Sequence, residues 1–180
     1  MNRQDSYALE GDPGWDRFMQ ARRADVEAAF LLPFLTPEMS IVDVGCGQGT
    51  ITAGLARAVG TGKARGFDPQ RAHIEKAREL AANEGLQNLS FEVGDNYDPP
   101  FESGSFDVAF TNMVLLHLED QERALQAMIN LEKPGGLIAT RERGSHGSGA
   151  GAEAAERMIH VLQSTVNATS KSRYGGSSAR

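Results

Sequence analysis

The chain has 180 residues, of which 40% are hydrophobic and 23% charged, and its formal net charge at pH 7 is −6. This length fits one domain with a substantial core, and the negative charge argues against general attraction to nucleic acid or to an anionic membrane. A single cysteine excludes an intramolecular disulfide, no signal-peptide core or membrane-spanning run is visible, and we expect a cytoplasmic protein.

Hydrophobic periodicity predicts helices and strands in alternation along the chain. Helices are expected at residues 16–32, 50–59, 69–85 and 121–131. Short apolar runs predict strands at residues 40–45, 63–68, 88–95, 106–112 and 136–142. Because strands that alternate with helices form right-handed βαβ units, we expect an α/β fold with a mainly parallel sheet.

The composition changes after residue 143. Residues 144–151 form a Gly/Ser-rich linker, and residues 152–168 have the apolar spacing of one amphipathic helix. The remaining residues are expected to be a flexible tail. We therefore divide the chain into a core at 1–143 and a linker, helix and tail at 144–180, with no strand after the fifth.

The sequence DVGCGQG at residues 43–49 lies at the carboxyl end of the first predicted strand. In a doubly wound sheet, ligands bind outside this end of the strands, and glycines let the main chain approach them closely. The NAD fingerprint has a different spacing, G-x-G-x-x-G, and the Asp43 carboxylate would repel a pyrophosphate. S-adenosylmethionine has no phosphate and carries an ammonium and a sulfonium, so charge favours it over a dinucleotide.

Two further acids end the next two predicted strands. Asp68 ends the second, where a carboxylate can accept hydrogen bonds from both ribose hydroxyls. Asp95 ends the third, where a carboxylate can accept one from an adenine amino group. Each acid alone is also explained as a helix N-cap or an Asx-turn. Three acids at the ends of three successive strands, facing one crevice, favour a ligand that carries a nucleoside.

These motifs resemble those of the class I S-adenosylmethionine-dependent methyltransferases, especially their small-molecule branch. The resemblance rests on IVDVGCGQGTIT, GFDPQ, FEVGDNYDPPF, SFDVAFTNMVLLHLED and LEKPGGLIA, which occur in this order. It covers about residues 15–143. It implies a Rossmann-like, doubly wound sheet of three αβα layers with strand order 3-2-1-4-5, and methyl transfer from S-adenosylmethionine to a small molecule.

The resemblance also implies which residues bind the cofactor. Contacts at the glycine-rich turn would come from Asp43, Gly45, Cys46, Gly47 and Gly49. Contacts to ribose and adenine would come from Asp68, Pro69, Gln70, Asp95 and Asn96. The methionine portion would lie beside Thr111 and Asn112. Its carboxylate would pair with Arg22 or equally with Arg23, although either side chain also fits a solvated helix face.

Methyl transfer from a sulfonium is an in-line displacement, so the protein mainly aligns the reactants and excludes water. A general base is needed only for an acceptor whose proton has a high pKa. His117, just beyond the fourth strand, is the candidate base, and packing at a helix start is its alternative explanation. Cys46 fits a small packing residue better than a nucleophile. Paired cysteines and a His-x-x-x-His pair are absent, so we expect no zinc site.

The chain departs from this family after the fifth strand, where members usually continue through a helix into an antiparallel pair of strands. We expect those antiparallel strands to be missing and the fifth strand to be an open edge, available to a second copy or a partner chain. Two other functions stay open. One is a cofactor-binding homologue that is inactive or completed by a partner, and the other is an NAD-dependent oxidoreductase.

Overall fold

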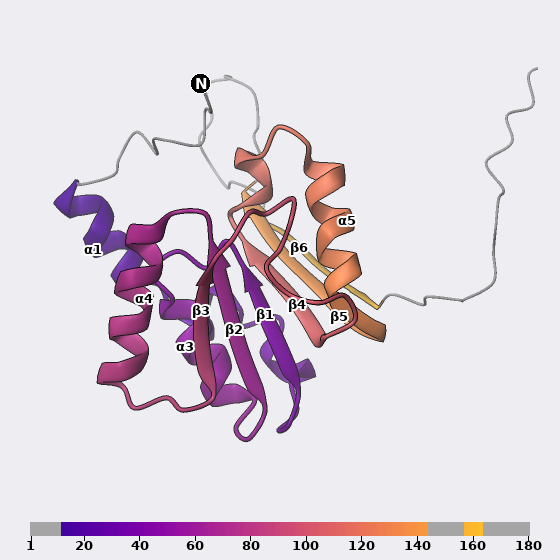
Figure 1. Ribbon diagram of the computed structural model, residues 1–180, viewed down its shortest axis with the longest axis horizontal. Coiled ribbons are helices and arrows are strands. Elements are labelled where there is room, and N and C mark those ends of the chain that lie inside the picture. The colour runs from indigo at the N-terminus through magenta and orange to yellow at the C-terminus, as the bar shows by residue number, and fades with distance from the viewer. Residues whose placement is uncertain (1–11, 144–156, 164–180) are drawn as a thin grey trace, which may run out of the picture.

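The computed structural model describes residues 12–143 and 157–163. These residues form one six-stranded sheet in the order β3-β2-β1-β4-β5-β6 (Figure 1). The first five strands are mutually parallel: β1 (Ser40–Val44), β2 (Lys63–Asp68), β3 (Leu89–Val93), β4 (Phe106–Asn112) and β5 (Glu132–Arg143). The predicted Rossmann-like sheet with strand order 3-2-1-4-5 is confirmed.

Helices cover both faces of this sheet (Figure 1). The described helices are α1 (Pro13–Ala21), α2 (Ala24–Glu27), α3 (Thr50–Ala58), α4 (Arg71–Asn83) and α5 (Gln121–Leu131), with short 3₁₀ turns at η1 (Leu32–Phe34) and η2 (Leu115–His117). α2, α3 and α4 pack on one face and α5 on the other. The three-layer arrangement expected from the sequence is therefore present.

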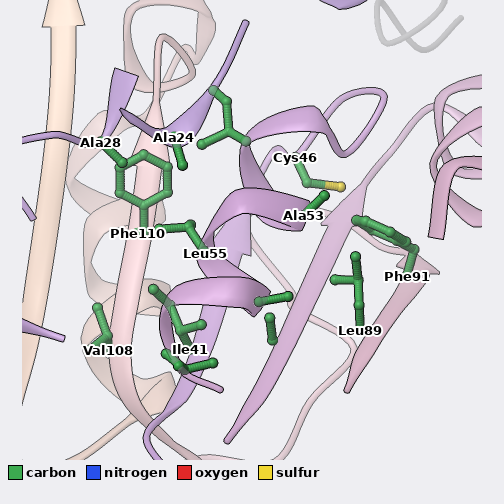
Figure 2. Packing of buried hydrophobic residues seen from close by; sticks show 14 of the residues in the cluster. Ala24, Ala28, Ile41, Cys46, Ala53, Leu55, Leu89, Phe91, Val108 and Phe110 are labelled. Carbon is green, nitrogen blue, oxygen red and sulfur yellow. The ribbon is translucent and has the colours of Figure 1, made fainter. Parts of the chain in front are cut away.

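Each face of the sheet has its own hydrophobic core, because successive side chains of a strand point to opposite faces. Ile41 of β1 packs with Leu55 of α3 and Phe110 of β4 on the first face, as Figure 2 shows. Its neighbour Val42 packs with Met128 of α5 on the second face. Each fully buried apolar side chain contributes roughly 1.5–3 kcal/mol, so the two cores fix the frame that carries the strand ends.

The single helix predicted at residues 16–32 is wrong. Arg22 and Arg23 are extended, with ψ angles of 139° and 151°, and they separate α1 from the four-residue α2. Ala24, the first residue of α2, lies so close to Gly54 of α3 that a Cβ on that glycine would be 2.5 Å from the Ala24 Cβ. This close approach requires the chain to change direction before α2, which periodicity could not reveal.

The expected absence of an antiparallel strand is also wrong. β6 (Arg157–Gln163) pairs antiparallel with β5, from Arg143↔Arg157 to Leu137↔Gln163. The helix predicted at residues 152–168 is thus replaced by a strand over these seven residues, and the rest of it lies outside the described residues. The twelve-residue β5 offers a long row of backbone hydrogen-bonding groups, which pairing with β6 satisfies in part.

Candidate functional site

The turn between β1 and α3, residues 45–49, is the glycine turn of this site. Gly45, Gly47 and Gly49 have φ angles of +70°, +54° and +79°, a region that strains residues with a side chain. A Cβ on Gly45 would lie 2.5 Å from Cγ2 of Val114, and one on Gly47 would lie 2.7 Å from Cε of Met19. The glycines are therefore needed both for the backbone conformation and for the close approach of neighbouring segments.

Asp68 ties the glycine turn to the end of β2. Its Oδ2 accepts a hydrogen bond from Gly47 N at 3.0 Å, and its Oδ1 accepts one from Gln70 N at 2.9 Å. His73 Nδ1 lies 3.4 Å from the same Oδ1. The carboxylate is 8% exposed, and two oxygens together can accept about four hydrogen bonds. Asp68 can therefore hold the turn and still accept a bond from a ligand.

Asp43, at the carboxyl end of β1, is a buried carboxyl group that is 3% exposed. Its Oδ2 accepts a hydrogen bond from Thr52 Oγ1 at 2.6 Å. Burial raises the pKa of Asp43 to about 7, although Thr52 and the charge of Arg22 lower it, and the charge of Asp68 raises it further. A cation bound nearby would favour the ionised form. Arg22, expected near the cofactor, is thus electrostatically coupled to Asp43.

The loops after β2 and β3 hold two buried side-chain oxygens without a partner among the described residues, Gln70 Oε1 and Asn96 Oδ1. Such atoms cost free energy unless a ligand or water satisfies them. Asp95, by contrast, accepts a hydrogen bond from Tyr97 N at 2.8 Å, which is the Asx-turn that the sequence left open. Asn96 Oδ1 and Gln70 Oε1 can therefore receive hydrogen bonds from a base.

A third such acceptor lies at the end of β4. Asn112 is 5% exposed, its Nδ2 donates to Glu27 Oε2 at 3.3 Å, and its Oδ1 has no partner among the described residues. Glu27 of α2 also forms an ion pair with Arg141 of β5. The hydroxyl of Thr111 donates to Val44 O at 3.0 Å, so it links β4 to β1.

The two side chains considered for chemistry differ in their surroundings. Cys46 is buried, and burial, with the charges of Asp43 and Asp68, raises the pKa of its thiol. A neutral, buried thiol fits the packing role expected of it. His117 is exposed at the end of η2. The neighbouring atoms still remove part of its hydration, which lowers the pKa of its imidazole. Its role as a base stays a prediction.

Within residues 12–143 and 157–163, no cluster of three or more His, Cys, Asp or Glu side chains could hold a metal ion. None of the helices described there is long and apolar enough to cross a membrane.

The hydrogen bonds that hold α1 against the glycine turn were not predicted from the sequence. Asp16 of α1 accepts hydrogen bonds from Gln48 Nε2 at 2.8 Å and from Lys76 Nζ at 2.9 Å. Thr50 Oγ1 donates to Met19 O at 3.2 Å. These contacts join residues at least 31 positions apart, and no local pattern marks them.

A hollow of about 630 Å³ lies next to the site, between the break that separates α1 from α2 and the helices α3 and α4. It shares Arg22 and Thr50 with the surroundings of the glycine turn, but its lining contains neither Asp43 nor Asp68. Its Arg57 forms an ion pair with Glu84. We therefore place the candidate site at the carboxyl ends of the strands and not in this hollow.

Comparison with known proteins gives consistent results. A family model described as a methyltransferase domain matches residues 35–172. An uncharacterised methyltransferase of Schizosaccharomyces pombe is 34% identical over 127 residues, 67% of this chain and 46% of that protein. The trans-aconitate 2-methyltransferase of Deinococcus radiodurans is 33% identical over 132 residues, 73% of this chain and 48% of that protein. The chain thus spans about half the length of these curated relatives.

Among solved structures, a S-adenosylmethionine-dependent methyltransferase from Aquifex aeolicus is similar with a TM-score of 0.66. It is 23% identical in sequence, and the match covers 77% of each chain. At this identity the likeness concerns the fold alone.

Proposed function

Because the chain belongs to the methyltransferase-domain family, we propose that it transfers a methyl group from S-adenosylmethionine to a small-molecule acceptor. One observation carries the proposal: three buried side-chain oxygens without a partner among the described residues lie at or just after the carboxyl ends of β2, β3 and β4. A ligand rich in hydrogen-bond donors would satisfy them. The cofactor of this family has such donors in its adenine amine, ribose hydroxyls and methionine ammonium.

The residues present fit this cofactor from end to end. Asp68, which keeps a free accepting position, would bind the ribose, and Gln70 and Asn96 would receive hydrogen bonds from adenine. Asn112 Oδ1 would accept one from the ammonium group. Arg22 would pair with the carboxylate. Gly45 and Gly47 would hold the turn in the left-handed conformation that presents its main chain to the ligand.

When bound, S-adenosylmethionine supplies a sulfonium that makes its methyl group electrophilic. The chain's own part is to hold the glycine turn, exclude water and balance charge. Asp43, in its ionised form, would offset the positive charge brought into a buried site. His117 would accept a proton only if the acceptor's own proton has a high pKa.

The small-molecule acceptor is supported by the similarity to a trans-aconitate 2-methyltransferase and by the net charge of −6, which disfavours a polyanion. Fold alone does not fix a reaction, so a cofactor-binding but inactive homologue is the alternative. The partner chain expected at the edge of β5 is no longer supported, because β6 already pairs with that edge. A second copy would have to pair with β6 or with β3, the two edges of the described sheet.

The direct test supplies S-adenosylmethionine and a panel of organic acids, phenols and amines, and measures release of S-adenosylhomocysteine. We expect acceptor-dependent release that is lost in Asp68→Ala and kept in Asp98→Ala, a change at an exposed carboxylate of the next loop. Cofactor binding without release for any acceptor would favour the inactive homologue. The absence of both binding and release would contradict the proposed function.

A further inference from the structure

The carboxylate of Glu142, near the end of β5, accepts hydrogen bonds from three consecutive backbone amides. Its Oε1 accepts from Val114 N at 3.2 Å and from Leu115 N at 3.1 Å, and its Oε2 accepts from Leu116 N at 3.4 Å. These amides open the 3₁₀ turn η2, where backbone donors have no partner within the turn itself. Glu142 thus fastens the loop after β4, residues 113–117, to β5.

The same loop is held in an unusual conformation. Met113 has a φ angle of +61°, which costs a residue with a side chain free energy unless its surroundings enforce it. Its backbone N donates to Arg141 O at 2.8 Å. β5 therefore holds the loop by a main-chain hydrogen bond at Arg141 and by the side-chain carboxylate of Glu142. Neither bond could be read from the sequence.

The loop also packs against the glycine turn. The side chain of Val114 lies where a Cβ on Gly45 would be, 2.5 Å from its Cγ2. A loop that moved away from β5 would therefore remove the packing against Gly45, and with it the support of the glycine turn proposed to receive the cofactor.

We propose that Glu142 is a positioning residue of the cofactor site, which holds the loop after β4 against Gly45 and so sets the affinity for the cofactor. This inference rests on the proposed function. It assigns Glu142 no contact with the cofactor or with the acceptor. Its effect passes through the three backbone amides and the side chain of Val114.

The electrostatics of Glu142 separate this role from a purely structural one. Burial raises the pKa of its carboxyl group, and the three amides offset that shift only in part. A carboxyl whose pKa is higher in the folded state favours folding only while it is protonated, and this contribution is lost as the pH rises through the folded pKa. The ionised carboxylate therefore contributes less to folding stability than its three hydrogen bonds alone would give.

The test compares Glu142→Gln with the wild type in two measurements, calorimetric titration with S-adenosylhomocysteine and thermal unfolding without ligand. The glutamine keeps one accepting oxygen but places an NH₂ group against a backbone N–H. We expect the Kd to rise about tenfold, equivalent to the loss of one charge-assisted hydrogen bond, while the Tm falls no further than in the control variant. The control is Asp120→Ala, because Asp120 caps α5 beyond the same loop by accepting from Arg123 N. It should change Tm but not Kd.

Each outcome separates the inference from the proposed function. If the wild type does not bind S-adenosylhomocysteine, the proposed function fails. If the wild type binds it and Glu142→Gln binds equally well, only the positioning role fails, and the same holds if the control variant loses as much affinity as Glu142→Gln. If Glu142→Gln does not fold, Val114→Ala tests the contact with Gly45 directly and leaves Glu142 intact. We expect weaker binding in that variant, and unchanged affinity would overturn the inference.

Discussion

The buried carboxyl group of Asp43 predicts that cofactor affinity depends on pH. Burial raises its pKa to about 7 in the free protein, so it holds a proton over much of the acidic range. The proposed cofactor brings an ammonium group into the site, and a nearby cation favours the ionised carboxylate. Binding should therefore lower the pKa of Asp43 and release a proton whenever the free protein carries one.

The size of the effect follows from the same pKa. Below about pH 7, each further unit of acidity should weaken binding by up to about tenfold, because one pKa unit corresponds to about 1.4 kcal/mol. The loss approaches about a hundredfold between about pH 7 and about pH 5 if the pKa in the complex lies below that range. Above about pH 8 the affinity should be nearly constant, since Asp43 is then ionised before binding.

Titration with S-adenosylhomocysteine from pH 5.5 to 8.5, in two buffers of different ionisation enthalpy, measures both the Kd and the protons released. Asp43→Asn should abolish the slope below pH 7. Asp107→Asn should keep it, because Asp107 pairs with Lys133 at the opposite end of β4. A wild-type affinity that does not change between pH 5.5 and 7, or a slope that survives in Asp43→Asn, would refute the reasoning.

Two further predictions concern the glycine turn and β6. Gly47→Ala and Gly85→Ala both force a side chain onto a left-handed backbone, so each should lower the stability by about 1–2 kcal/mol in thermal unfolding. Only Gly47→Ala should weaken binding of S-adenosylhomocysteine, and equal binding losses would contradict the assigned site. Val161→Pro and Leu162→Pro are made in turn, because successive N–H groups of an edge strand point alternately toward and away from its partner, and one of the two should speed amide hydrogen exchange along β5. Unchanged exchange in both variants would show that β6 does not pair there.

The sequence predicted those elements whose signal is local. β2 and β4 have the bounds expected for them, because short apolar runs between turns mark buried strands. The failures arise from contacts between distant segments. The break before Ala24 follows from its approach to Gly54, and β6 forms because the edge of β5 offers it partners. The spacing of apolar residues carries no information about either contact, so it predicted a helix in both places.

The candidate site divides in the same way. The glycine turn and Asp68 were visible as a motif at strand ends, since such ligand sites recur at fixed places in doubly wound sheets. Glu142 and Glu27 were not predicted from the sequence. Glu142 contacts a residue 28 positions away, and Glu27 contacts one 85 positions away. Asp95 accepts a hydrogen bond from Tyr97 N in a local turn, and its contact with the adenine stays a prediction.

The central claim is that the carboxyl ends of β1 to β4 bind the methyl-donor cofactor and not a dinucleotide. Parallel calorimetric titrations of the purified chain with S-adenosylhomocysteine and with NAD test it most directly. We predict saturable binding of S-adenosylhomocysteine at one site, lost in Asp68→Ala, and no measurable heat with NAD. Saturable binding of NAD at micromolar concentration, together with no response to S-adenosylhomocysteine, would contradict the claim.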